Sequence, residues 1–249
     1  MSNTVLMSTS FGLSGEQILP FLQSLIASNY GGTFVLFSDD LSFPQDAIAN
    51  FPFSFIQEAY TNHGYPDLHG GVNRLFLYRD FLEKHDEFDK VITSGIRDVI
   101  FQENPDNIIP TGDINIYMED EGTTIGGCQY NRKWIRDIYP ECLNDLLNKH
   151  MICPEIICGS RDAFLKLTHA MIEEAKKKKE CAYLVDMAIL IKMYYGSELP
   201  YCTAIPNECS PVYTVGRVSK LHVKEHKIYN HSGYMPVMVH QYDRHIKHV

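Results

Sequence analysis

The first hundred residues alternate between short apolar runs and longer segments whose apolar residues recur at helical spacing. Strands are expected over 4–8, 33–37, 53–56 and 91–92, and helices over 18–26 and 72–84. Ser14 and Gln17 have the spacing of a capping box ahead of the first helix. This order is typical of an α/β fold. We therefore predict a Rossmann-like mixed sheet with helices on its faces.

The second half of the chain continues the same kind of pattern with shorter elements. Strands are expected over 114–118, 152–158, 212–215 and 238–239, and helices over 131–138, 141–147, 162–180 and 186–195. We find no internal repeat, low-complexity tract or Pro/Gly linker. The sequence therefore predicts one domain over residues 1–249.

Composition narrows the possible partners of the protein. With 249 residues, 45% of them hydrophobic, the chain can bury one sizeable core. A net charge of −9 argues against a broad surface for nucleic acid or an anionic membrane. No apolar stretch approaches the roughly 18 residues of a membrane span, no secretory leader is visible, and the 7 cysteines form no CxxC pair. We expect a cytoplasmic protein without a membrane span.

Charged residues follow the predicted strand at Val91 and Ile92, where the chain runs on to Arg97 and Asp98. In open α/β sheets, ligands bind outside the carboxyl ends of the strands. An acid beside an arginine at that edge suits a phosphorylated ligand, so Asp98 is a candidate residue for a nucleotide-sugar site. The simpler alternative is a surface ion pair between Asp98 and Arg97, which stabilises little.

Two further strand ends carry polar groups. Thr9, Ser10 and Phe11 follow the first strand, where hydroxyls and backbone groups are placed to meet a base and a ribose. Asp39 follows the second strand and is a candidate acceptor for a nucleotide hydrogen bond. A turn or helix-capping role is the more ordinary explanation for Asp39.

Three landmarks occur in a fixed order along the chain. They are Arg97-Asp98-Val99-Ile100-Phe101-Gln102 with Pro105, then Glu119-Asp120 with Thr124-Ile125-Gly126 and Asn131-x-x-Trp134-Ile135, then Val239-His240-Gln241-Tyr242-Asp243-Arg244-His245. Together they resemble a group of GT-A-fold glycosyltransferases of algal viruses, some bacteria and plants. The resemblance covers nearly the whole chain. It implies a first half, about 1–105, that binds nucleotide and a second half, about 106–249, that shapes an acceptor pocket.

The resemblance implies transfer of a sugar from a nucleoside diphosphate donor, UDP-type or GDP-type with UDP favoured, to a hydroxyl of a glycan. Mn²⁺ or Mg²⁺ usually assists in such enzymes. Asp98 and His240 match the metal-binding positions, with diphosphate and water to complete the coordination. A lone histidine is otherwise more often structural or exposed.

The chain departs from the resembling enzymes in its metal motif. Gly95 stands where they usually have the first acid, and the segments 158–161 and 186–188 also differ. These departures favour a first alternative, a degenerate binding module that has lost catalysis. A second alternative is a hydrolase that acts on nucleotide sugars or phosphate esters through the same metal site. The absence of a P-loop and of a glycine-rich dinucleotide motif argues against ATPases and dehydrogenases.

Two more charged residues complete the predicted site. Arg74 and Arg97 are candidates to bind the nucleotide, because a guanidinium binds phosphate bidentately. For Arg74, a surface pair with Asp80 or Glu83 is equally plausible. Asp186 is the candidate catalytic carboxylate beside Asp98. Its alternative role is electrostatic stabilisation of the helix that it begins.

Overall fold

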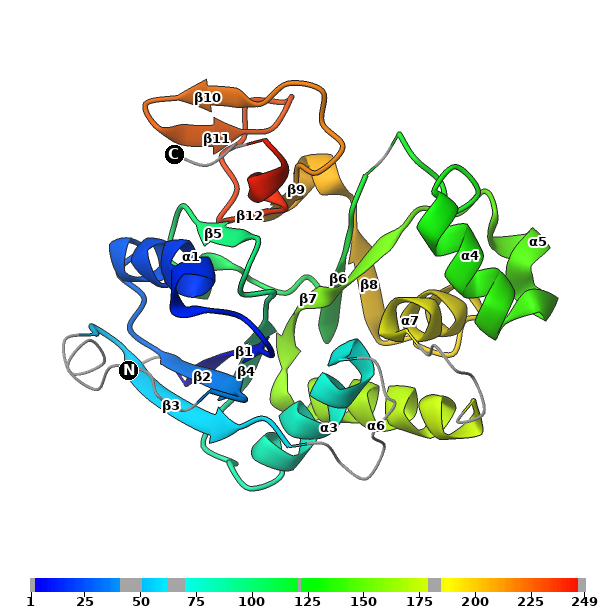
Figure 1. Cartoon of the computed structure of the whole chain (residues 1–249), viewed down its shortest axis with the longest axis horizontal. Helices are drawn as coiled ribbons and strands as arrows, with labels where there is room; N and C mark the ends of the chain where they lie inside the picture. Colours follow the sequence, from blue (N-terminus) through cyan, green and yellow to red (C-terminus); the bar gives the residue numbers. More distant parts are fainter. Residues whose placement is uncertain (1–2, 41–50, 62–69, 121, 179–184, 246–249) are drawn as a thin grey trace.

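The structure is a computed structural model that describes residues 3–40, 51–61, 70–120, 122–178 and 185–245 (Figure 1). Within these ranges a seven-stranded mixed sheet has the order β3-β2-β1-β4-β7-β6-β8. Its strands are β1 (Thr4–Ser10), β2 (Thr33–Ser38), β3 (Ser54–Ala59), β4 (Lys90–Thr93), β6 (Ile114–Met118), β7 (Ile152–Ser160) and β8 (Cys202–Ile205). The predicted α/β fold with a mixed sheet is confirmed.

One strand of this sheet, β7, runs opposite to all the others. The strands β3, β2, β1 and β4 run parallel to one another, whereas β7 is antiparallel to both β4 and β6. The last strand, β8, is parallel to β6. The carboxyl ends of β1, β2 and β4 therefore share one edge, which is where the predicted nucleotide residues lie.

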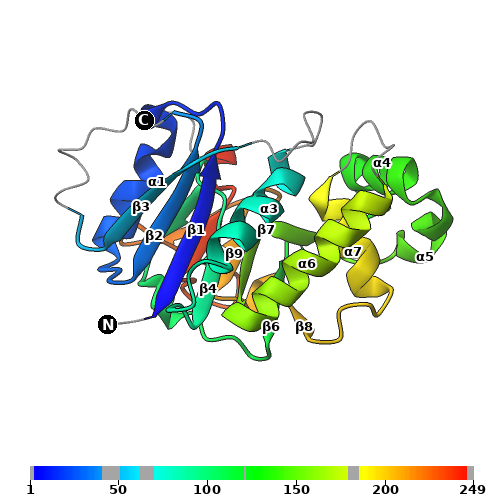
Figure 2. The ribbon, with the colours of Figure 1, turned by 90° about the horizontal axis from the view of Figure 1, so that it is seen from below.

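Helices cover both faces of the sheet because neighbouring residues of β1 point to opposite sides. Val5 and Met7 face one core, and Leu6 faces the other. The first core is covered by α3 (Gly70–Leu82), α6 (Arg161–Lys177) and α7 (Asp186–Tyr195), with α3 beside α6 in Figure 2. The second core is covered by α1 (Gly15–Ala27). The middle of β1 is therefore apolar on both faces, as is typical of covered parallel strands.

A small three-stranded sheet lies beside α1, in the order β5-β12-β9 (Figure 1). It contains β5 (Val99–Phe101), β9 (Val212–Thr214) and β12 (Met238–His240). The central strand β12 is antiparallel to β5 and parallel to β9. This sheet joins the segment after Asp98 to the last described part of the chain.

The other elements lie at the periphery. They are the hairpin β10 (His222–Lys224) and β11 (Lys227–Tyr229), the helices α4 (Gln129–Ile138) and α5 (Leu143–Leu146), and the 3₁₀ turns η1 (Pro105–Asn107), η2 (Pro140–Cys142), η3 (Asn207–Cys209) and η4 (Tyr242–Arg244). Among the helices that the structure describes, none combines the length and apolarity needed to cross a lipid bilayer.

Most predicted elements exist with shifted ends. The capping box is confirmed, since the Ser14 N–H donates to Gln17 Oε1 at 2.9 Å. The prediction that the first strand ends at Ser8 is wrong, because β1 continues through Thr9 and Ser10 in register with β2. The strands β5, β8, β10 and β11 were not predicted. In both sheets, strand pairing also joins the two predicted halves of the chain, which meet near residue 105. In the large sheet β7 pairs with β4, and in the small sheet β12 pairs with β5.

Candidate functional site

Asp98 lies in the turn between β4 and β5, at the carboxyl edge of the parallel strands. The turn is anchored to β1, because the Ser8 hydroxyl donates to the Ser94 carbonyl at 2.7 Å and the Ser94 N–H donates to the Met7 carbonyl at 3.1 Å. On its other side the Gln241 N–H donates to the Asp98 carbonyl at 2.7 Å. The predicted metal motif and the C-terminal motif therefore meet.

His240 is buried at the end of β12, with 2% of its surface exposed. Its Nδ1 lies 3.1 Å from Thr214 Oγ1, and its Nε2 lies 3.6 Å from Asp98 Oδ2. When Nδ1 donates its proton to Thr214, Nε2 carries the lone pair and faces the carboxylates. The predicted proximity of Asp98 and His240 is confirmed, and the alternative of an exposed histidine is wrong.

Glu155 joins this pair, although its sequence context did not suggest a site. It comes from β7, and its Oε2 lies 4.0 Å from His240 Nε2. A register shift separates the pair Ile116–Ile157 from the pair Tyr117–Cys153, so β7 carries additional residues at this point. Such a bulge changes the direction of a side chain. An acid next to Pro154 in an otherwise apolar strand was the available signal.

Asp98, Glu155 and His240 could hold a metal ion. One ligand atom from each lies within 4.8 Å of the other two. Ligands bound about 2.0–2.2 Å from one ion are at most about 4.4 Å apart, and both His240 distances, 3.6 Å and 4.0 Å, satisfy this limit. Burial raises the pKa of the nearby Cys153 thiol well above its usual range, so that sulfur stays protonated and is a poor ligand.

The electrostatics of the group favour a cation. Burial raises the pKa of the Asp98 carboxyl, while the nearby His240 ring acts in the opposite direction and Glu155 raises this pKa further. A proton therefore occupies Asp98 more readily than it occupies a carboxyl in water. A divalent ion would replace that proton and offset the repulsion between the two carboxylates.

Arg74 is buried against the Glu155 carboxylate instead of lying on the surface. Its Nη1 is 3.2 Å from Glu155 Oε1 and its Nη2 is 2.5 Å from Asp186 Oδ2. The alternative of a surface pair between Arg74 and Asp80 or Glu83 is wrong, because Arg74 is buried and pairs with Glu155 and Asp186. Arg74 nevertheless contributes to the wall of a cavity near Asp98, so its predicted contact with nucleotide stays a prediction.

Asp186 begins α7 and has 4% of its side chain exposed. Its Oδ2 pairs with Arg74, and its Oδ1 accepts the Met187 N–H at 3.0 Å. Asp186 thus lies in the first turn of α7, the position from which the predicted electrostatic stabilisation of this helix would act. Both carboxylate oxygens have partners, and Asp186 also lines a cavity of about 240 Å³ together with Asp98 and Glu155. Its proposed catalytic use stays a prediction.

The predicted nucleotide residues divide into two groups. Thr9 and Arg97 lie at a cavity of about 320 Å³ that also includes Gly95, Asp98 and Glu155. Arg97 does not pair with Asp98 as the surface alternative supposed, but lies 3.4 Å from Asp243 Oδ2. This cavity is the part of the structure that suits a phosphate group.

The other nucleotide candidates lie further along the sheet edge. Ser10 is buried within β1, whereas Phe11 is 63% exposed and its ring centroid is 4.8 Å from that of Tyr60. Asp39 accepts the Gly12 N–H at 3.1 Å and 3.2 Å, which ties the segment after β2 to the segment after β1. Its turn or helix-capping role stays a prediction. The predicted contacts of Ser10, Phe11 and Asp39 with a base or ribose stay predictions.

A second cavity, of about 240 Å³, adjoins the first at the possible metal ligands. It shares Asp98 and Glu155 with the first cavity and adds His240, Trp134 and Glu119, among other residues. Burial raises the pKa of the Glu119 carboxyl. The three possible metal ligands thus lie where two cavities of different character meet.

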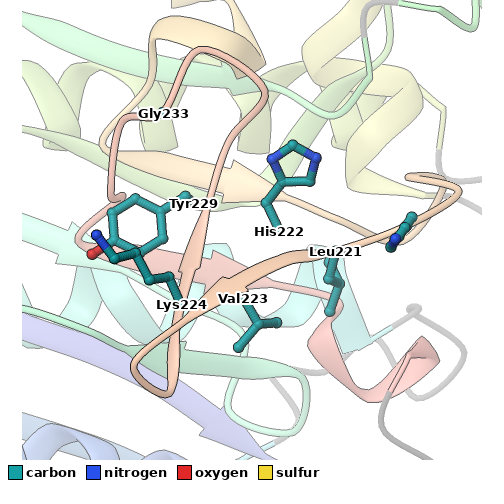
Figure 3. A pocket seen from close by; sticks show the side chains of 7 residues that line it. Leu221, His222, Val223, Lys224, Tyr229 and Gly233 are labelled. Atoms are coloured by element: carbon teal, nitrogen blue, oxygen red, sulfur yellow. The ribbon is translucent and has the colours of Figure 1, made fainter.

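The largest of these cavities, of about 510 Å³, lies at the β10–β11 hairpin (Figure 3). It is lined by Lys220, Leu221, His222, Val223, Lys224, Tyr229 and Gly233. Among the described residues that line it, none carries a carboxylate. Since hard cations prefer oxygen ligands, the smaller pair of cavities, which contains carboxylates, is the better candidate site.

Comparison with known proteins adds no family assignment. A scan against models of protein families finds no match, and a search of curated proteins finds no related sequence. The functional argument therefore depends on the residues and the geometry of the site.

Proposed function

We propose that the protein is a metal-dependent glycosyltransferase that moves a sugar from a nucleoside diphosphate donor to a hydroxyl of a glycan. The observation that carries this proposal is the junction of two cavities at Asp98 and Glu155. A group-transfer enzyme must hold donor and acceptor next to each other, so that the acceptor hydroxyl reaches the carbon at which the donor bond breaks. Two cavities that share the metal ligands meet that requirement.

The donor belongs in the cavity with Thr9 and Arg97. Arg97 has 62% of its side chain exposed, and its 3.4 Å contact with Asp243 is long, so its guanidinium can exchange this partner for a phosphate. Asp98, Glu155 and His240 would hold a cation beside that phosphate. When bound, the cation supplies Lewis-acid stabilisation to the diphosphate as it leaves.

The acceptor belongs in the cavity with Trp134. An indole face suits the apolar face of a sugar ring, while Glu119 and Arg244 offer polar partners at the same cavity. The raised pKa of Glu119 brings this carboxyl closer to neutral pH, where a general base works best. It is the alternative to Asp186 for taking the proton from the acceptor hydroxyl.

The donor atoms favour Mn²⁺ over Mg²⁺. Two carboxylates suit either ion, but an imidazole is a better ligand for a transition metal, and Mg²⁺ usually retains several waters. Isothermal titration with UDP, GDP and dTDP, each with and without Mn²⁺, tests the proposal. We expect one diphosphate to bind more tightly with Mn²⁺. The proposal is wrong if none of the three binds under either condition.

A second candidate function is a module that binds a nucleotide sugar without transferring it. The observation in its favour is that both oxygens of Asp186 are held by Arg74 and the Met187 N–H. Incubation of a UDP-sugar with glycan acceptors, followed by product analysis, separates the functions. Transfer products support the enzyme, free sugar indicates a hydrolase, and an unchanged donor that still binds indicates the module.

A further inference from the structure

Gly95 lies in the turn between β4 and β5, and its missing side chain leaves space that another residue uses. A Cβ atom built on Gly95 would lie 2.5 Å from Glu155 Oε2 and 3.1 Å from Asp98 Oδ1. Carbon and oxygen atoms without a bond do not approach to 2.5 Å. The Glu155 carboxylate therefore occupies the space in which a side chain at position 95 would begin.

Thr93 holds the bulge that brings Glu155 to this place. Its hydroxyl donates to the Glu155 carbonyl at 2.8 Å and accepts the Ile157 N–H at 3.1 Å. The pairing of β7 with β6 is interrupted at this point. Because Pro154 has no N–H, the interruption leaves no backbone donor of this residue unpaired. The last residue of β4 thus fixes the backbone on both sides of the bulge.

Arg74 fixes the carboxylate itself. Nη1 binds Glu155 Oε1 at 3.2 Å, while Oε2 is the oxygen near Gly95 and 4.0 Å from His240 Nε2. Arg74 is buried and its guanidinium is permanently charged. One oxygen of Glu155 is therefore held by the protein, and the other is directed at Asp98 and His240.

We propose that Glu155 is the second acidic ligand of the metal and that position 95 must be glycine for the Glu155 carboxylate to fit. An aspartate at position 95 can then replace Glu155 as a ligand when the Glu155 carboxylate is removed. This inference rests on the metal site of the proposed function but not on sugar transfer. It assigns the missing acid of the Gly95–Asp98 turn to a different strand of the sheet.

Mn²⁺ binding to the full chain without nucleotide tests the inference, measured by isothermal titration or by the electron paramagnetic resonance of free Mn²⁺. We expect Glu155→Gln and Gly95→Ala each to weaken binding about tenfold or more, since each removes or displaces one ligand. The double variant Gly95→Asp/Glu155→Ala restores a carboxylate at the vacated space, and its affinity should recover to within about threefold of wild type.

Gly31→Ala is the matched control, because a Cβ atom at Gly31 meets no heavy atom within 4 Å. It should bind Mn²⁺ like the wild type, and circular dichroism should show every variant folded. The inference is overturned if the wild type binds no Mn²⁺, if Glu155→Gln binds as tightly as wild type, or if the double variant shows no recovery. If these affinities follow the expected pattern and no nucleoside diphosphate binds, the glycosyltransferase proposal fails and this inference stands.

Discussion

The pair between Arg74 and Asp186 permits a direct test of whether Asp186 is structural. Both side chains are buried, with 7% and 4% exposed. Loss of one partner of a buried ion pair costs about 3–5 kcal/mol, because the other charge stays buried without compensation. Glu155 still offers Arg74 one carboxylate at 3.2 Å, so Asp186→Asn should reduce the free energy of unfolding by the lower value, about 3 kcal/mol.

Urea unfolding followed by circular dichroism measures this free energy, and the thermal midpoint provides a second readout. At about 2–4 °C per kcal/mol for a chain of this size, the midpoint should fall by roughly 6–12 °C. Asp137→Asn is the control, since it removes an exposed carboxylate that pairs with Lys133 on α4. Its unfolding curve should match that of the wild type.

A change below about 1 kcal/mol in Asp186→Asn, which is typical of an exposed pair, would refute this reasoning. Should that variant be stable and yet inactive, the Asp186 carboxylate would have to act on the substrate. Should it be unstable, loss of activity alone would carry no information about catalysis. The stability measurement therefore has to precede any kinetic interpretation of this residue.

Three further results are expected. Thr214→Val removes the partner of His240 Nδ1 and should weaken Mn²⁺ binding by about 10–100-fold, whereas Thr214→Ser should not weaken it. Equal affinities in both variants would contradict the idea that Thr214 orients the His240 ring. Because burial raises the pKa of Asp98 in the folded state, the metal-free protein binds that proton more tightly than the unfolded chain, and its stability falls as pH rises between the unfolded and the folded pKa. In urea titrations the stability of Asp98→Asn relative to wild type should therefore increase with pH in that window, and a constant difference would show that the carboxyl is not perturbed. Arg97→Ala should weaken UDP binding about tenfold, measured by titration, with Arg132→Ala on α4 as the unaffected control.

The parts of the fold with a regular pattern were predictable. The succession β1, α1 and β2 follows from continuous apolar runs and one helical stripe, which local sequence specifies. The hairpin of β10 and β11 was missed because its turn residues, Glu225 and His226, adopt φ values of 51° and 62° without the glycine or asparagine that usually marks such a turn. The strand β8 has only four residues, too few for a clear period.

The site was predictable to the extent that its residues follow strands or belong to recognised motifs. Asp98 and His240 met both conditions, and the structure brings them together. Glu155 met neither condition, because a bulge depends on the pairing of strands and is not encoded in the strand's own apolar pattern. For Arg74, the alternative to nucleotide binding named acids close to it in sequence, whereas its partners come from β7 and α7.

The position of β12 between β5 and β9 has a consequence for how the protein is made. A ribosome releases the carboxylates of Asp98 and Glu155 well before it adds His240, since domains emerge from the N-terminal side first. Until β12 is inserted, β5 lacks its antiparallel neighbour and exposes unpaired backbone groups. Nascent chains that end before Met238 should therefore bind Mn²⁺ poorly and associate through that edge. Metal binding by these three residues would thus report that synthesis has passed this strand.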